Sequence, residues 1–402
     1  MPDTDTSSPE LVQAEAFIQK KDFAAAEPLL RKVASGDATN YVVWFELGFV
    51  ENGLGKVEES ISAYRKSVAA KADVFESNLN LGLQLAKTSQ PDAEQFLRAA
   101  TQLKPTSHVA EGQSRAWLSL AHVLEGSKPE EALAAYREAA ILQPKDAEPH
   151  LSAGQLLEKQ NKFADAEQEY KQALALDPSS DALTALANLS MRGRRLPEAA
   201  EYLRKLVAER PDDANAHIQL GRVLAAESKN DDAIAELETA AKLAPDDLSL
   251  QRDLADLYST TGKHEQAEAA YRALVTAHPN DAESHYGLGK TLLLQKKFVD
   301  AEKELALAVK LKPDFGIAYG DLAFVASENK DYPLALKALD FRLKFLPENA
   351  NTYFLRASAL DHLKDFKRAS VNYRLFLQAA HGKYPDQEWQ AKHRLIAIEP
   401  KK

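Results

Sequence analysis

Apolar residues recur along this chain at spacings of three and four, in short runs separated by polar breaks. Residues 214–247 show the pattern in one unit. The first run contains His217, Leu220, Gly221 and Leu224, and the second contains Ala233, Leu237, Ala240 and Leu243. This spacing places apolar side chains on one face of a helix. Proline ends the second run, because it lacks an N–H group and disfavours helix for the residue before it. The pattern predicts two helices joined by a turn, and no strand pattern occurs in the chain.

The two-helix unit repeats with a period of 34 residues. Prolines mark the end of successive units at Pro105, Pro144, Pro178, Pro211, Pro245, Pro279, Pro313 and Pro347. A small residue marks the second helix at Ala26, Ser60, Ala93, Ala132, Ala166, Ala199, Ala233, Ala267, Ala301, Ala335 and Ala369. Because both series keep nearly the same period, we expect an array of repeats.

Small residues also occupy one position of the first helix in each unit, where two antiparallel helices must approach closely. This position holds Ala14, Gly48, Gly82, Ala121, Gly154, Asn188, Gly221, Ala255, Gly289, Ala323 and Ala357. Only Asn188 is larger than alanine. A large side chain there would hold the paired helices apart, so the series supports the predicted pairing.

The repeat resembles the tetratricopeptide repeat (TPR). The residues that carry the resemblance are Trp44, Leu47 and Gly48 in one unit and Phe163, Ala166, Tyr170, Ala173 and Pro178 in another. It covers residues 7–381 as eleven units, with a short insertion near 108–113. It implies an all-α, right-handed superhelix of antiparallel helix pairs, an α-solenoid. Residues 1–6 are expected to be disordered.

A capping helix is expected after the last unit, because a repeat array otherwise leaves an apolar end open. Residues 382–402 are assigned to this cap and its tail, with a helix over 385–398. Trp389 and Ile396 are seven residues apart and so share one helix face. We expect that face to cover the last repeat, with Trp389 packed against it.

A peptide-binding groove is implied by the resemblance, since the first helix of each TPR unit lines a concave face. The corresponding residues here are Phe45, Phe49, Leu79, Leu83, Arg192, Arg222, Arg252, Lys290, Tyr286, Phe324 and Phe354. Along the chain they are first apolar, then basic, then aromatic. Two simpler interpretations stay open. The apolar side chains could pack against the neighbouring repeat, and the basic ones could be ordinary surface charge.

Composition narrows the classes of partner. The 402 residues include 50 basic and 60 acidic side chains, a net charge of −10, which argues against nucleic-acid partners. No window approaches the roughly 18 uninterrupted apolar residues of a membrane-spanning helix, so no membrane insertion is expected. The chain has no cysteine, which excludes disulfides, thiolate metal sites and a cysteine nucleophile.

Candidate catalytic and metal-binding motifs are weak. The sequence Gly289-Lys290-Thr291 lacks the earlier glycine and the strand of a phosphate-binding loop. His150, His217 and His285 occupy the same position in three units, where packing against the neighbouring helix explains them. Acidic pairs in the turns are suited to capping the helices that follow. We therefore expect no enzyme activity, no cofactor and no metal.

The leading hypothesis is a monomeric, non-enzymatic scaffold for protein–protein interaction. It would hold an extended peptide or a partner helix in its concave groove. The alternative is an architectural subunit of a larger assembly, such as a cell-envelope or secretion complex, that uses its end and convex faces. The sequence fits a cytoplasmic protein, or an exported one if a signal peptide has been removed.

Overall fold

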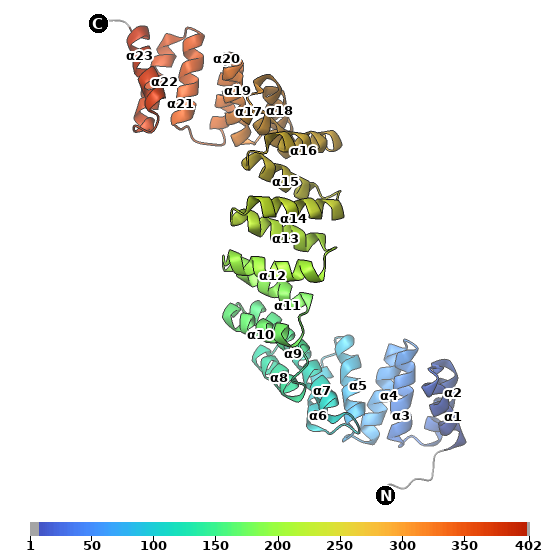
Figure 1. Cartoon of the computed structure of the whole chain (residues 1–402). Coiled ribbons are helices and arrows are strands. Elements are labelled where there is room, and N and C mark those ends of the chain that lie inside the picture. The colour runs from blue at the N-terminus through green and yellow to red at the C-terminus, as the bar shows by residue number, and fades with distance from the viewer. Residues whose placement is uncertain (1–7, 400–402) are drawn as a thin grey trace. The chain divides into compact units, whose positions relative to one another are not determined.

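The computed structural model describes residues 8–399, and all the regular structure in that range is helical (Figure 1). The predicted all-α fold of paired helices is thereby confirmed. Residues 1–6, expected to be disordered, lie outside the described residues, as do 400–402 of the tail. None of the described helices is long and apolar enough to cross a membrane.

The chain divides into two compact units, residues 1–194 and 195–402, called unit 1 and unit 2 below. The helices of unit 1 are α1 (Pro9–Gln19), α2 (Phe23–Gly36), α3 (Tyr41–Gly53), α4 (Val57–Ala70), α5 (Phe75–Lys87), α6 (Ala93–Gln102), α7 (Val109–Leu124), α8 (Pro129–Leu142), α9 (Glu148–Lys159), α10 (Phe163–Leu176) and α11 (Ser180–Arg192).

Unit 2 contains the remaining twelve described helices. These are α12 (Leu196–Glu209), α13 (Ala214–Ala226), α14 (Asn230–Leu243), α15 (Leu248–Thr260), α16 (His264–Ala277), α17 (Ala282–Leu294), α18 (Phe298–Leu311), α19 (Gly316–Glu328), α20 (Tyr332–Leu343), α21 (Ala350–His362), α22 (Phe366–Ala380) and α23 (Pro385–Ile398).

Within each unit, an odd-numbered helix packs against the even-numbered helix that follows it. The predicted small residues lie at these contacts. A Cβ atom added to Gly221 of α13 would lie 2.7 Å from Cγ of Leu237 on α14. A Cβ atom added to Gly289 of α17 would lie 2.7 Å from Cγ of Leu305 on α18. Glycine at both positions therefore allows the close approach of the paired helices, and an added Cβ atom would force the facing leucine to shift.

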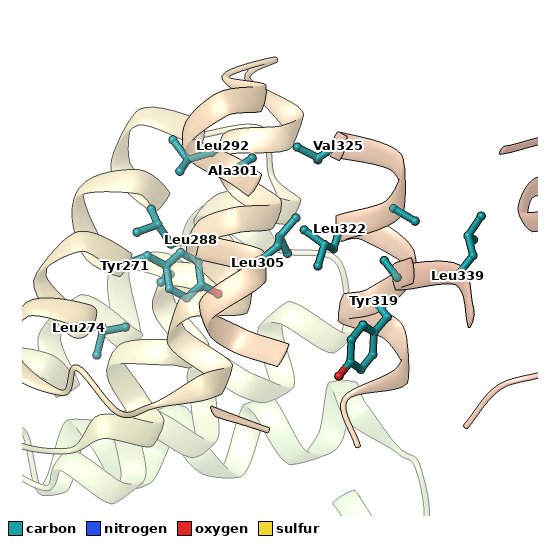
Figure 2. Close-up of a cluster of buried hydrophobic side chains, with 13 residues drawn as sticks. Tyr271, Leu274, Leu288, Leu292, Ala301, Leu305, Tyr319, Leu322, Val325 and Leu339 are labelled. Atoms are coloured by element: carbon teal, nitrogen blue, oxygen red, sulfur yellow. The ribbon is translucent and has the colours of Figure 1, made fainter. Parts of the chain in front are cut away.

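The apolar core continues from one repeat to the next. Figure 2 shows one cluster in unit 2, whose buried side chains come from six consecutive helices, α15 to α20. Its labelled members are Tyr271, Leu274, Leu288, Leu292, Ala301, Leu305, Tyr319, Leu322, Val325 and Leu339. Each repeat thus buries its apolar face only with the help of its neighbours, as expected of a repeat array.

Lysines at the starts of even-numbered helices tie successive repeats together. Each forms an ion pair of 2.6–2.8 Å with an acid on the preceding even-numbered helix. The pairs are Lys56–Glu27, Lys128–Glu94, Lys162–Glu130, Lys263–Asp231 and Lys297–Glu268. We call them the lysine ladder. Because they are partly exposed, each contributes under about 1 kcal/mol.

The cap helix α23 is present over the predicted residues, but the predicted contact face is wrong. Trp389 and Ile396 are 62% and 76% exposed, so neither covers the last repeat. Ala391 is fully buried instead, and Leu395 packs against the same cluster of α22. These residues lie on the opposite side of the helix from Trp389, since 100° of rotation separates successive positions.

Two contacts explain which face of α23 packs inward. The small side chain of Ala391 allows the helix to approach α22 closely. Arg394 donates two hydrogen bonds, of 2.7 and 2.6 Å, to the buried carboxylate of Asp361 on α21. This two-point ion pair fixes the rotation of the helix. The sequence analysis gave weight to the largest apolar side chains and so selected the wrong stripe.

Candidate binding groove

Within each unit, neighbouring odd-numbered helices contact one another along one side. In unit 2, α15, α17, α19 and α21 contact each other in succession, and in unit 1 α5 contacts α7. Helices on the inside of a curved stack lie closer together than those on the outside. The odd-numbered helices therefore line an inner face within each unit. This is the face on which the candidate residues were expected.

The apolar candidates of unit 1 differ in exposure. Leu79 is buried and offers no surface to a partner, as the packing interpretation anticipated. Phe45 and Leu83 are half-buried, and the ring of Phe45 lies 5.8 Å from that of Tyr64. Phe49 is exposed and meets Phe23 edge-on. Phe49 is therefore the most accessible member of this group.

Glu46, between these aromatic residues, is an acid without a cation. One of its carboxylate oxygens is buried and has no hydrogen-bond partner among the described residues. Burial, with a smaller contribution from the negative charge of Glu15, raises the pKa of Glu46 to about 7. Its charged form is thus disfavoured where it stands. The sequence analysis did not select Glu46.

Two basic candidates of unit 2, Arg222 and Arg252, are paired with acids on the next odd-numbered helix. Arg222 on α13 forms an ion pair of 2.5 Å with Asp253 on α15. Arg252 on α15 lies 3.7 Å from Glu283 on α17. These pairs neutralise the charge that was expected to attract a partner. The surface-charge interpretation therefore describes this part of the inner face, with the addition that the charges are internally matched.

The other two basic candidates also have neighbours of their own. Arg192 stacks on the ring of Phe163 at 4.4 Å and lies 3.6 Å from Glu158, all within unit 1. Lys290 on α17 is exposed, and its charge acts on Asp321 of α19. Within unit 2, Arg222 and Arg252 are therefore engaged with acids, and Lys290 is the exposed cation among the basic candidates of that unit.

The aromatic candidates lie towards the end of unit 2. The hydroxyl of Tyr286 on α17 donates a 3.0 Å hydrogen bond to Asp321 on α19. Burial raises the pKa of Asp321, and the bond from Tyr286 and the charge of Lys290 oppose that shift. Phe324 on α19 is exposed, whereas Phe354 on α21 is half-buried against Phe376.

Phe324 and Phe354 both line a groove of about 730 Å³ between α19, α21 and α23. Its apolar wall comes from Ile317, Phe324, Leu346, Phe354 and Leu355. Its polar wall comes mainly from Asp321, Ser327, Asn349, Asn351, Ser358, Gln387 and Gln390. This mixture of aromatic surface and uncharged amide side chains distinguishes the groove from the paired charges along α13 to α17.

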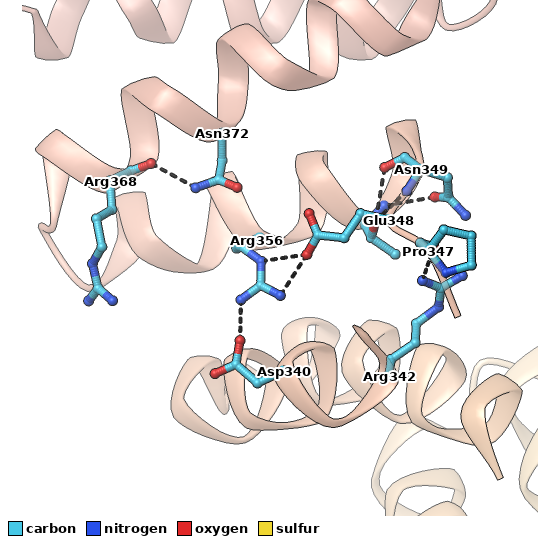
Figure 3. Close-up of polar contacts among 9 residues, drawn as sticks. Asp340, Arg342, Pro347, Glu348, Asn349, Arg356, Arg368 and Asn372 are labelled. Atoms are coloured by element: carbon cyan, nitrogen blue, oxygen red, sulfur yellow. Dashed lines mark hydrogen bonds and ion pairs between the residues drawn. The ribbon is translucent and has the colours of Figure 1, made fainter. Parts of the chain in front are cut away.

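An arginine network supports one end of the groove (Figure 3). Arg356 on α21 donates to Glu348 at 2.8 and 3.1 Å and to Asp340 on α20 at 2.5 Å. Arg342 donates to the carbonyl oxygen of Pro347 at 2.8 Å. Both arginines occupy positions that are apolar in other repeats. Together they hold the loop between α20 and α21, from which Asn349 enters the groove.

The sequence analysis missed the amide side chains of the groove. Gln387 and Gln390 lie on α23, whose inward face was assigned to the wrong stripe. Asn351 lies at the start of α21 and was passed over in favour of larger residues. A helical projection of α23 centred on Ala391 would have identified both glutamines, because they lie one turn or less from that contact.

Comparison with known proteins supports the repeat. A family model described as tetratricopeptide repeat matches residues 122–181, 151–214, 184–248, 218–265 and 252–314. Protein O-mannosyl-transferase TMTC3 of Homo sapiens is 23% identical over an alignment of 384 residues that covers 83% of this chain and 42% of TMTC3. The chain spans less than half the length of these O-mannosyl-transferase relatives.

Two solved structures show the range of similarity. The Cut9 and Hcn1 hetero-tetramer of the APC/C matches 98% of this chain and 97% of its own at 15% identity, with a TM-score of 0.44. YrrB, described as a TPR protein with an unusual peptide-binding site, matches 46% of this chain and 96% of its own. The identity to YrrB is 22% and the TM-score 0.42.

Proposed function

Because the chain is a tetratricopeptide repeat protein, a scaffold of the kind that in general mediates protein–protein interaction, we propose that it binds an extended peptide segment of a partner. The proposed site is the groove between α19, α21 and α23. The observation that carries the proposal is the pairing of exposed aromatic surface with amide side chains in one cavity of about 730 Å³.

The chemistry of the groove suits a peptide main chain. Each asparagine or glutamine side chain offers both a donor and an acceptor, as an extended peptide does at every residue. Phe324 and Phe354 supply apolar surface for a side chain of the partner. The lining carries three charged side chains, Asp321, Glu328 and Arg342, of which Asp321 accepts from Tyr286 and Arg342 donates to the carbonyl oxygen of Pro347. We expect a ligand anchored by an apolar residue, because Phe324 and Phe354 form the aromatic surface of the groove.

A displayed library of random peptides, selected on the whole protein, tests this proposal. Phe324→Ala should weaken the selected peptides at least tenfold, and Gln390→Ala several-fold. Phe49→Ala is the matched control, because Phe49 is an equally exposed phenylalanine on the inner face of unit 1. Peptides that bind Phe324→Ala and the unmodified chain equally would contradict the proposal, provided that circular dichroism shows both folded.

We also propose that the chain is not itself an enzyme. Acids in its turns cap helices, as Asp213, Asp247 and Asp281 do for α13, α15 and α17. The name O-mannosyl-transferase belongs to relatives of which this chain spans less than half. Transfer of mannose from an activated donor to any acceptor by the purified chain would contradict this proposal.

A second candidate function is an architectural subunit that associates through its end face. The observation that favours it is the outer side of α23, where the ring centroids of exposed Trp389 and His393 lie 3.9 Å apart with the rings tilted by 33°, and Ile396 is also exposed. Exposed aromatic and aliphatic side chains on one helix face suit a contact surface. Sedimentation over a wide concentration range separates the two candidates. The leading proposal expects a monomer throughout, whereas association abolished by Trp389→Ser favours the second.

A further inference from the structure

Three histidines in corresponding positions of their repeats form the same ion pair. His150, His217 and His285 each place Nδ1 at 2.6–2.7 Å from a glutamate oxygen on the following even-numbered helix. The glutamates are Glu169, Glu236 and Glu304. In every other repeat, the position of the histidine and the position of the glutamate are both filled by other residue types. The two residues therefore occur together or not at all.

The other ring nitrogen has a consistent partner in two of the three repeats. Nε2 of His217 lies 3.1 Å from the carbonyl oxygen of Pro211, and Nε2 of His285 lies 3.0 Å from that of Pro279. A carbonyl oxygen only accepts, so Nε2 carries a proton in both. In three other repeats, the corresponding residue is also a donor to a carbonyl oxygen six residues earlier. Trp44 donates to Ala38, Asn78 to Ala72 and Gln251 to Pro245.

His150 is the exception, because its Nε2 has no partner among the described residues. Its side chain is 20% exposed, against 7% and 6% for His217 and His285. The ring borders a cavity of about 420 Å³ between α8, α9 and α10. The position filled by a proline carbonyl in the other two repeats is therefore open to a ligand here.

Pro149 explains the difference. In the repeat of His217, Asp213 caps α13 by accepting from the backbone N–H of Ala216. The corresponding residues at His150 are Asp146 and Pro149, and proline has no N–H to donate. Asp146 accepts from the N–H of Glu148 instead, and α9 begins at Glu148 without a side-chain cap. The altered turn leaves the carbonyl of Pro144 unused by His150.

The cavity has a cationic floor and apolar walls. Arg137 of α8 lines it beside His150 and forms no ion pair within the described part of the chain. Ala140, Ile141, Pro144, Pro149 and Ala153 form the walls, and Ile141 is 68% exposed with nothing covering it. The charged or titratable residues that line the cavity with His150 are Arg137 and Tyr136 from α8 and Glu169 from α10. Tyr136 is engaged, since its hydroxyl donates to Glu125.

We propose that this cavity binds a carboxylate carried on an apolar group. The carboxylate would accept from Nε2 of His150, in the place that a proline carbonyl takes at His217 and His285, and from the guanidinium of Arg137. Two donors, at least one of them charged, match the two oxygens of a carboxylate. The apolar walls would enclose the attached group, and the volume is within the range of small-ligand pockets.

The probes are 3-phenylpropionate, its neutral amide, and a pentapeptide ending in phenylalanine with a free or an amidated C-terminus. Calorimetric titration of the whole protein should show saturable binding of the acids and at least tenfold weaker binding of both amides. If 3-phenylpropionate binds as tightly as the pentapeptide with a free C-terminus, the cavity is a small-molecule site. If that pentapeptide binds at least tenfold more tightly than 3-phenylpropionate, the cavity binds the C-terminus of a chain. Equal binding of acids and amides would overturn the proposal.

Variants of the chain provide matched controls. Arg137→Ala and His150→Gln should each weaken acid binding at least tenfold. Both should fold, because Ala306 and Gln251 fill the corresponding positions elsewhere. Arg204→Ala and His217→Gln, the same changes two repeats later, should leave binding unchanged. If Arg137→Ala and His150→Gln bind the acids as tightly as Arg204→Ala and His217→Gln do, the carboxylate does not bind in this cavity.

A further measurement separates this role from a merely structural one. Pro149→Ala restores a backbone N–H that Asp146 can cap, so His150 should gain the carbonyl of Pro144 and acid binding should weaken at least tenfold without loss of stability. Undiminished binding by Pro149→Ala would contradict the assignment of Nε2 as the donor.

Discussion

The inner face of unit 2 has two regions built from the same helix positions with different results. Along α13 to α17, arginines reach acids on the next odd-numbered helix, as in Arg222–Asp253 and Arg252–Glu283. Along α19 to α23, aromatic and amide side chains border a groove of about 730 Å³. The position of a residue in its repeat thus decides which way it faces. Its availability to a partner depends on what the next repeat places opposite.

Removal of Arg356 should have the largest effect on stability, because it lies in the groove region and is nearly buried. Arg356→Ala leaves the carboxylate of Glu348, which is also nearly buried, without its cation. We expect a loss of about 2–4 kcal/mol in the free energy of unfolding, measured by urea denaturation with circular dichroism. If the loss of unfolding free energy is as small as that caused by removing an exposed arginine, water readily replaces the Arg356 side chain as the partner of Glu348.

The attachment of α23 gives the next largest effect. Arg394→Ala removes both hydrogen bonds to the buried carboxylate of Asp361 and should cost about 1–3 kcal/mol. Trp389→Ser, on the exposed side of the same helix, should change stability by less than about 0.5 kcal/mol. Thermal unfolding of the two variants distinguishes the two faces. A larger effect from Trp389 would restore the contact face predicted from the sequence.

Glu46 extends the comparison to unit 1, where an inner-face acid has no cation. Its raised pKa means that the fold favours the neutral carboxyl, so this contribution to stability is full below about pH 4.5 and is lost as the pH rises to about 7. Glu46→Gln should therefore stabilise the protein by about 1–2 kcal/mol at pH 8, allowing for partial solvation, and by almost nothing at pH 4.5. Melting temperatures at the two values test the difference.

The self-paired region should give the smallest effect. Arg222→Ala should cost less than about 1 kcal/mol, and the cost should shrink further in 1 M salt, because both partners are partly exposed. Urea denaturation at low and high salt provides the measurement. A loss that persists at high salt would mean that the pair acts through packing and not through charge.

The helices and their pairing could be predicted from the sequence because the same pattern of small and apolar residues recurs in each repeat. Gly221 and Gly289 show this, since a period of 34 residues identifies them and the contacts with Leu237 and Leu305 explain them. Even the bounds of α23 were predictable, from Pro385 at its start and the polar tail after its end. Local signals of this kind need no knowledge of neighbouring repeats.

The site was harder to predict, because it depends on neighbours. Leu79 and Phe49 occupy inner positions, yet one is buried and the other exposed. The rotation of α23 depends on Asp361, which lies 33 residues before its partner Arg394. The position of Nε2 of His150 depends on a missing N–H at Pro149. Each of these features is a relation between residues that no single periodic series contains.

The lysine ladder and the histidine–glutamate pairs differ in what happens when a repeat is copied or removed. His217 and Glu236 belong to one repeat, so duplication of that repeat carries the pair along complete. Lys263 and Asp231 belong to successive repeats, so each new copy must find its acid on the repeat before it. An added repeat therefore depends on the repeat before it for the lysine ladder, but on no other repeat for a histidine–glutamate pair. An inserted repeat keeps its internal hydrogen bonds and ion pairs at any position in the array. Its lysine forms the ion pair of the ladder only where the even-numbered helix of the preceding repeat carries an acid at the corresponding position.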